Sequence, residues 1–314
     1  MGRVLVTRRL PAGGLDPLVD AGHELVQRVD DTPWSHEELL DAAGDVDAIV
    51  CLLTDQIDAA VLSAGAPRLR VVANVAVGYD NIDLEAAGAH GVAVCNTPGV
   101  LDETTADLAF LLILAAARGA SGAEADLRAG RWSGWGIQDH LGTDVHGGTL
   151  GLVGFGRIGR AVGRRAAGFD MRVLHHTRHD TGVEGWVADL DELVAASDVV
   201  SLHVPLTDET RHLIDARRLA LMKRHAVLVN TSRGPAVDEE ALAAALEDGT
   251  ILAAGLDVYE REPEVHPRLL RAPRVTLLPH IGSATTATRL RMAQVASDGA
   301  RAVLAGERPW NLVV

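Results

Sequence analysis

Residues 151–159, Gly-Leu-Val-Gly-Phe-Gly-Arg-Ile-Gly, decide how the rest of the chain is interpreted. An apolar run over 150–153 leads into these glycines, and a helical pattern over 160–168 follows them. The G-x-G-x-x-G spacing between strand and helix is typical of dinucleotide binding, because the glycines permit a tight turn, approach of a pyrophosphate and close helix packing. The alternative is a glycine turn without a ligand, since the chain has 32 glycines. The residues expected to hold the phosphates are Gly154, Gly156, Arg157, Ile158 and Gly159.

Composition and charge favour a soluble protein with a small-molecule partner. The 314 residues suffice for two domains of about 150 residues each. A net charge of −14 argues against a nucleic-acid backbone or an anionic membrane as partner. Cys51 and Cys95 lie in apolar runs without metal-ligand spacing, which predicts buried reduced thiols, no metal and a cytoplasmic location. The apolar run 108–117 is about half a membrane span, so we expect a buried helix there.

The first hundred residues alternate between short apolar runs and helical patterns, which predicts a parallel α/β domain. A capping box at Ser35 to Glu38 opens one predicted helix, and Asp83 caps another over 84–90. The breaker 97–99 precedes a very apolar helix over 103–118. The predicted strands are 4–7, 25–29, 48–53, 71–74 and 92–96.

A second alternating series begins at the glycine motif and matches a complete dinucleotide-binding sheet. A long helix over 285–305 then leaves this sheet, and the run 310–314 is expected to return to the first domain. The prediction is an α/β protein of two Rossmann-like, doubly wound parallel-sheet domains with a cleft between them. A discontinuous substrate-binding, flavodoxin-like domain takes 1–98 plus 286–314, and a dinucleotide-binding domain takes 99–285. The second set of strands is 150–153, 171–175, 199–204, 226–230, 252–257 and 275–278.

Three loops of the second domain follow predicted strands and carry chemically useful side chains. Arg233 lies in Asn-Thr-Ser-Arg-Gly, Glu262 in the loop 257–263, and His280 in Pro-His-Ile-Gly-Ser. An arginine binds a carboxylate through two parallel hydrogen bonds, a histidine transfers a proton, and a glutamate orients the imidazole. Each residue alone is equally consistent with a surface charge or an ordinary loop. Their joint position at strand ends predicts an acid/base site for an anionic substrate.

These motifs together resemble the D-isomer-specific 2-hydroxyacid dehydrogenases, and the likeness runs from end to end. It rests on the glycine motif, on Asn-Thr-Ser-Arg-Gly at 230–234, on Gly-Leu-Asp-Val-Tyr-Glu-x-Glu-Pro at 255–263 and on Pro-His-Ile-Gly-Ser at 279–283. Segments 74–81 and 104–107 add to it. The segment Arg-Trp-Ser-Gly-Trp at 131–135 is similar to the dimerisation arm of glyoxylate/hydroxypyruvate reductases.

The resemblance implies a role for each matching residue. Arg233 would bind the substrate carboxylate and keto oxygen, and His280, paired with Glu262, would donate a proton during reduction. The backbone of Val77 and Gly78 would bind the carboxylate from the opposite lobe. Trp135 would reach the partner subunit's site in a homodimer, or would only anchor the dimer interface. The residues expected to line the cofactor are Thr105, Val204, Pro205, Thr231, Asp257 and Gly282.

The sequence also predicts which cofactor and substrate are used. An NAD site places a carboxylate about 20 residues after the glycine motif, but Thr177 stands there and Arg178 follows it. We therefore expect NADP(H) to be preferred, with NAD(H) possible; in the alternative, Arg178 stacks on the adenine of a cofactor-tolerant site. The expected activity is reduction of glyoxylate or hydroxypyruvate to the D-2-hydroxy acid. The alternatives are a bulkier 2-oxo acid, or a non-catalytic, NAD(P)-sensing module like the dehydrogenase-like corepressors.

Overall fold

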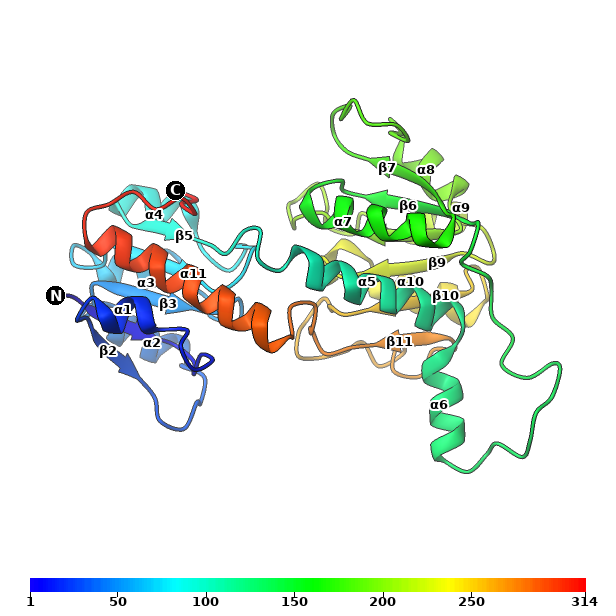
Figure 1. The fold of residues 1–314 in the computed structure, drawn as a ribbon, viewed down its shortest axis with the longest axis horizontal. Coiled ribbons are helices and arrows are strands. Elements are labelled where there is room, and N and C mark those ends of the chain that lie inside the picture. The colour runs from blue at the N-terminus through cyan, green and yellow to red at the C-terminus, as the bar shows by residue number, and fades with distance from the viewer. The chain divides into compact units, whose positions relative to one another are not determined.

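The computed structural model describes residues 1–314, which divide into two compact units. Unit 1 contains 1–101 and 283–314, and unit 2 contains 102–282. Each unit is a parallel sheet flanked by helices, so the predicted α/β class with two doubly wound sheets is confirmed (Figure 1). The sequence placed the two boundaries at 98/99 and 285/286, a few residues from these positions.

Unit 1 has five parallel strands in the order β2-β1-β3-β4-β5, which is the flavodoxin-like order. All five predicted runs form strands, because every one except the edge strand β2 is almost entirely buried. The bounds are β1 Arg3–Val6, β2 Glu24–Gln27, β3 Ala48–Cys51, β4 Val71–Asn74 and β5 Ala93–Cys95.

The helices of unit 1 begin at the predicted caps. Ser35 accepts a hydrogen bond from the Glu38 amide while the Glu38 carboxylate accepts one from the Ser35 amide, which is the predicted capping box. Asp83 caps α4 through the Ala86 amide. The bounds are α1 Asp16–Asp20, α2 His36–Ala43, α3 Ala59–Gly65, α4 Leu84–His90 and α11 Thr286–Leu304.

The carboxyl-terminal residues complete unit 1. Leu312 forms an antiparallel bridge with Cys95, and the amide of Val313 donates to the Val94 carbonyl at 2.7 Å. The predicted return of 310–314 to the first domain is therefore confirmed. Cys51 and Cys95 are both buried and form no disulfide.

Unit 2 has six parallel strands in the order β11-β10-β9-β8-β6-β7, and all six were predicted. Beyond the edge strand β7, Trp186 forms a single parallel bridge with His175, where a further strand would otherwise lie. If the segment at Trp186 is counted as that strand, the strand order matches that of dinucleotide-binding sheets. The strands are β6 Thr149–Val153, β7 Arg172–His176, β8 Val199–Leu202, β9 Val227–Asn230, β10 Ala253–Leu256 and β11 Val275–Leu277.

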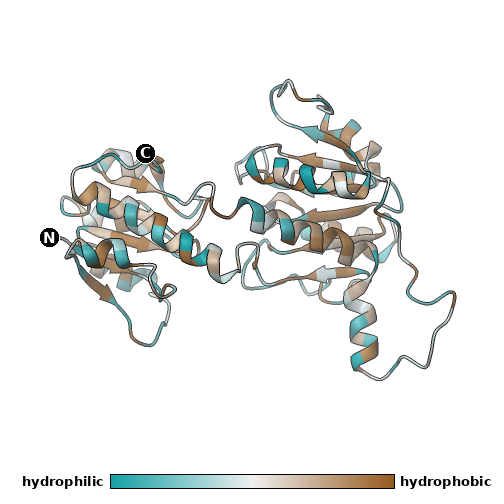
Figure 2. Ribbon diagram, viewed as in Figure 1, coloured by the Kyte–Doolittle hydropathy of each residue, from teal (hydrophilic) through white to brown (hydrophobic).

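Helices cover both faces of this sheet. The apolar α5 packs on β9 and β10, where a side chain at Gly255 would meet Leu112, and Figure 2 shows this helix as mostly hydrophobic. No single helix is long and apolar enough to cross a membrane; α5 and α6 reach that length only together, across a 68° bend. The bounds are α5 Asp102–Ala117, α6 Ala120–Arg128, α7 Arg157–Ala166, α8 Leu190–Ala196, α9 Ala216–Leu221 and α10 Glu239–Glu247, with short 3-10 turns at Ala167–Phe169 and Gly234–Ala236.

Candidate active site

The glycine motif forms the turn between β6 and α7. Gly154 has a φ of +92°, and a side chain there would lie 2.5 Å from the His203 carbonyl oxygen. A Cβ on Gly159 would lie 2.3 Å from the Gly154 carbonyl oxygen, so the helix packs directly on the turn. Gly156 caps α7, and a Cβ there would meet nothing within 4 Å. The turn thus has the open approach and the helix amino terminus that fit a pyrophosphate.

The β6–α7 turn lies where the strand order reverses, since β6 has β7 on one side and β8 on the other. In such sheets, ligands bind outside the carboxyl ends of the strands at this position. Val204 and Pro205 follow β8, and Val204 Cγ1 would lie 3.1 Å from a Cβ on Gly154. Val204 therefore lies beside the glycine turn, and Pro205 follows it in the chain.

Thr177 directly follows β7, at the carboxyl edge of the sheet. Its hydroxyl donates to the His179 carbonyl at 2.7 Å, and Arg178 is exposed. The nearest following carboxylate, Asp180, accepts the Gly182 amide at 2.8 Å within its own turn. The end of β7 therefore presents a hydroxyl and a cation in the position where an NAD site presents a carboxylate.

The carboxyl ends of β10 and β11 bring Glu262 and His280 together. His280 Nδ1 lies 2.8 Å from Glu262 Oε2, and the two side chains are 27% and 30% exposed. Glu262 Oε1 accepts the Tyr259 amide at 3.0 Å, so both carboxylate oxygens have partners. Nδ1 is therefore committed to Glu262, which leaves Nε2 as the ring nitrogen available to a substrate.

Arg233 belongs to the same group of side chains. Burial raises the pKa of Glu262, but the hydrogen bond and charge of His280, the Tyr259 amide and the charge of Arg233 outweigh it, so the net pKa is lowered. Asn230 fixes the Arg233 loop by donating to the Arg233 carbonyl at 2.8 Å and accepting the Ser232 amide at 3.0 Å. The three predicted catalytic side chains thus lie at the ends of the neighbouring strands β9, β10 and β11.

Asp257 has a structural role that the sequence did not indicate. Its carboxylate is buried and accepts the amides of Ile281 and Gly282 at 2.7 Å each, while its carbonyl accepts the His280 amide at 2.9 Å. Burial raises the pKa of Asp257, although these amides oppose the effect. His280 has a φ of +52°, a left-handed conformation that the three bonds hold in place. No sequence motif signals this role, because it depends on how the loop after β11 folds back on β10.

Two predicted cofactor residues lie nearby in unit 2. Thr105 of α5 is buried and donates to the Gly282 carbonyl at 3.3 Å. The Thr231 hydroxyl is buried and has no hydrogen-bond partner within the protein. Buried hydroxyl groups normally have a hydrogen-bond partner. A polar group of a bound cofactor would supply the partner that the Thr231 hydroxyl lacks.

The segment 131–148 forms an irregular arm after α6. Two contacts hold the part of the arm from 131 to 141. Arg131 pairs with Asp126, and Arg274 donates to the Leu141 carbonyl at 2.7 Å. Trp135, at 80% exposure, is one of several large apolar side chains that the arm and adjacent helices expose. These side chains are Leu111, Leu127, Trp132, Trp135, Ile137 and Leu141.

In unit 1, Val77 and Gly78 follow β4 and are half-buried. Neither backbone amide donates a hydrogen bond within unit 1. Two unpaired, partly exposed amides in succession suit an anion such as a carboxylate.

Comparison with known proteins decides the family. Residues 110–282 match the model of the D-isomer specific 2-hydroxyacid dehydrogenase, NAD binding domain. The chain belongs to this family. A glyoxylate reductase of Korarchaeum cryptofilum is 49% identical, over 99% of this chain and 95% of that protein.

Solved structures share the fold of the chain. A protein of Thermus thermophilus has a TM-score of 0.93 at 45% identity, covering 99% of this chain and 100% of the other. The NADPH-dependent glyoxylate/hydroxypyruvate reductase of Sinorhizobium meliloti, in complex with NADP and malonate, has a TM-score of 0.85 at 35% identity and covers 99% and 96%. The chain is therefore an oxidoreductase of the D-2-hydroxyacid dehydrogenase family whose second unit binds a pyridine nucleotide.

Proposed function

We propose that this protein reduces glyoxylate or hydroxypyruvate to the corresponding D-2-hydroxy acid. The observation that carries the proposal is the His280–Glu262 pair beside Arg233, in the same unit as the glycine turn. A relative that is 49% identical is a glyoxylate reductase, which supports the choice of substrate. In this proposal unit 1 is the substrate-binding domain and unit 2 is the dinucleotide-binding domain.

The side chains divide the work by their chemistry. The Arg233 guanidinium binds the substrate carboxylate and polarises the keto oxygen through its planar fork of donors. His280 donates the proton of Nε2 to the oxygen at C2, while Glu262 holds the ring through Nδ1. The amides of Val77 and Gly78 bind the carboxylate. A bound, reduced pyridine nucleotide would supply the hydride. The residues that would hold its phosphates are Gly154, Gly156, Arg157, Ile158 and Gly159, and those that would line the rest of it are Thr105, Val204, Pro205, Thr231, Asp257 and Gly282.

We propose a preference for NADPH over NADH. Arg178 offers a cation to a ribose 2′-phosphate, and Thr177 stands where an NAD site has the carboxylate that would repel it. The Sinorhizobium meliloti relative was solved with NADP, which supports this preference. In the alternative, Arg178 stacks on adenine and the site accepts both cofactors.

We also propose a cytoplasmic homodimer. The large apolar side chains that the arm, α5 and α6 expose would be covered by a second copy of the chain, with Trp135 extending toward the partner's site. The free buried cysteines suit a reducing compartment.

The test measures kcat/KM of the purified protein for glyoxylate, hydroxypyruvate and bulkier 2-oxo acids, with NADPH and with NADH. Turnover of the two small acids with a clear NADPH preference supports the proposal. A higher kcat/KM for bulky acids contradicts the substrate, and a clear NADH preference contradicts the cofactor. Cofactor binding without turnover of any acid indicates the sensing module instead.

A further inference from the structure

The loop after β4 is held by its carbonyl groups. The Ala76 carbonyl accepts the Thr97 amide at 2.9 Å, and the Val77 carbonyl accepts Asn96 Nδ2 at 2.8 Å. The Gly78 carbonyl accepts Asn74 Nδ2, also at 2.8 Å. Three successive carbonyls are therefore bound by donors from the ends of β4 and β5.

Fixing these carbonyls also fixes the amides on the other side of each peptide plane. In a trans peptide the C=O and the following N–H point in opposite directions. The bonds to residues 76, 77 and 78 thus set the directions of the amides of Val77, Gly78 and Tyr79. None of these three amides donates a hydrogen bond within unit 1. Successive N–H groups on one side of a loop form a nest for an anion.

Asn74 is suited to this task because its side-chain amide has two hydrogens and both are used. Besides the Gly78 carbonyl, Asn74 Nδ2 donates to Asn81 Oδ1 at 3.0 Å, and the whole residue is buried. Asn81 in turn donates to the carbonyls of Leu52 and Asp55, at 3.1 and 3.0 Å. The loop is thereby connected to the end of β3.

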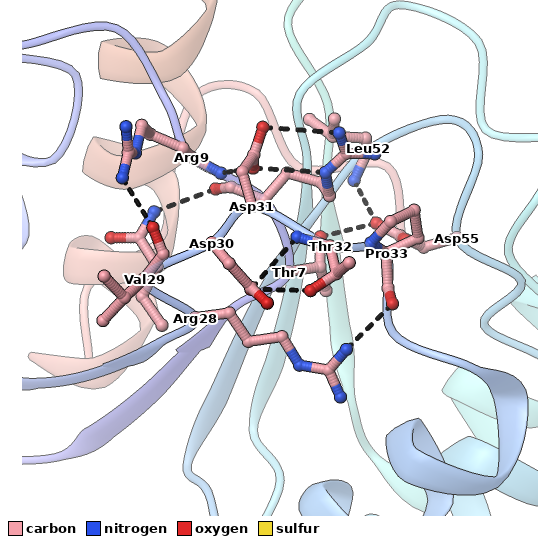
Figure 3. A network of polar contacts seen from close by, with 12 residues as sticks. Thr7, Arg9, Arg28, Val29, Asp30, Asp31, Thr32, Pro33, Leu52 and Asp55 are labelled. Carbon is pink, nitrogen blue, oxygen red and sulfur yellow. Dashed lines mark hydrogen bonds and ion pairs between the residues drawn. The ribbon is translucent and has the colours of Figure 1, made fainter.

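The connection continues to β1. The buried Asp55 carboxylate accepts the Thr7 hydroxyl at 2.5 Å and the Leu52 amide at 2.8 Å, as Figure 3 shows. Thr7 directly follows β1, and β1 lies next to β3 at the point where the strand order of this sheet reverses. The loop after β4 is therefore connected, through the loop after β3, to the end of β1.

We propose that Asn74 and Asn96 are positioning residues that aim the amides of Val77, Gly78 and Tyr79 at the substrate carboxylate. The inference rests on the proposed function for the identity of that anion. It adds Tyr79 to the expected pair of amides and assigns the two asparagine side chains the task of orienting them. Alanine at either position removes the bond that holds one of these peptide planes, so the loop binds a carboxylate more weakly.

The test uses oxalate, a small dicarboxylate, as the probe, and follows the amides of Val77, Gly78 and Tyr79 by NMR of the full chain. We expect all three signals to shift on titration, and Asn74→Ala and Asn96→Ala each to raise the Kd for oxalate about tenfold. The Kd for NADPH should stay unchanged. Asp83→Ala, which removes only the cap of α4, is the control for a general loss of stability in unit 1.

An unchanged Kd for oxalate in both asparagine variants overturns the inference, as does an equal rise in the Asp83→Ala control. Absence of any shift at the three amides of the wild-type protein also overturns it. Oxalate binding at these amides in a protein that reduces no 2-oxo acid contradicts only the proposed function. The two proposals therefore fail separately.

Discussion

His280 Nδ1 lies 2.8 Å from Glu262 Oε2, although the two residues come from loops after different strands. The pairing follows from the sheet, because β10 and β11 are neighbours and their carboxyl ends lie at the same edge. It assigns a separate task to each nitrogen of the ring. Nδ1 is held by the carboxylate, and Nε2 is presented for proton transfer.

Glu262→Gln is expected to lower kcat about a hundredfold without changing the Kd for NADPH, because an amide no longer stabilises the imidazolium or fixes its orientation. Steady-state kinetics with glyoxylate measures the effect. Glu260→Gln is the matched control, since Glu260 lies on the same turn but contacts His212 instead. If kcat falls equally in both variants, the loss comes from a disturbed turn and not from the missing contact with His280.

Arg233→Lys is expected to raise the KM for the 2-oxo acid steeply and also to lower kcat, together about a hundredfold in kcat/KM. The charge remains, but a single ammonium cannot make two parallel bonds to a carboxylate. Arg261→Lys changes an exposed arginine on the neighbouring loop and serves as the control. If Arg233→Lys keeps the wild-type KM, Arg233 does not bind the substrate.

Thr177→Asp is expected to lower the ratio of kcat/KM for NADPH to that for NADH by about tenfold or more, because a carboxylate repels the 2′-phosphate and binds the 2′-hydroxyl. Thr177→Asn is the control, because asparagine has nearly the same shape as aspartate but no charge. This variant should keep the wild-type ratio. The ratio is measured with glyoxylate at saturation. An unchanged ratio in Thr177→Asp would place the specificity elsewhere.

The sequence predicts those features that depend on local pattern and strand adjacency. All eleven strands coincide with apolar runs, and in every strand except the edge strand β2 the buried residues require such a run. The ends of neighbouring strands bring Arg233, Glu262 and His280 together. Helix α6 was not predicted, since it buries no residue and so carries no apolar stripe. The roles of Asp257 and Asn74 depend on bonds to loop backbone, which a residue pattern does not specify.

Asp198 provides a test of stability against pH. Burial raises its pKa, but the bonds from Lys223, the Thr149 amide and His225 outweigh this and lower the pKa from 3.8 to about 2. A lowered pKa means that the carboxylate stabilises the fold above about pH 4, and that this contribution is lost as the pH falls through about 2. The stabilisation at neutral pH is about 1 to 2 kcal/mol.

Asp198→Asn should therefore lower the free energy of unfolding in urea at about pH 7, and the difference from wild type should shrink at about pH 3. Asp170→Asn removes a highly exposed carboxylate that faces His146 and should have little effect. A difference that is the same at both pH values would contradict the assignment of the stabilisation to the charge of Asp198.

The most direct measurement is kcat of His280→Ala for glyoxylate with NADPH, beside the Kd of the variant for NADPH. The proton on Nε2 is central to the account, so kcat should fall by about a thousandfold or more while the Kd stays unchanged. Turnover close to that of the wild-type protein would show that His280 is not the proton donor.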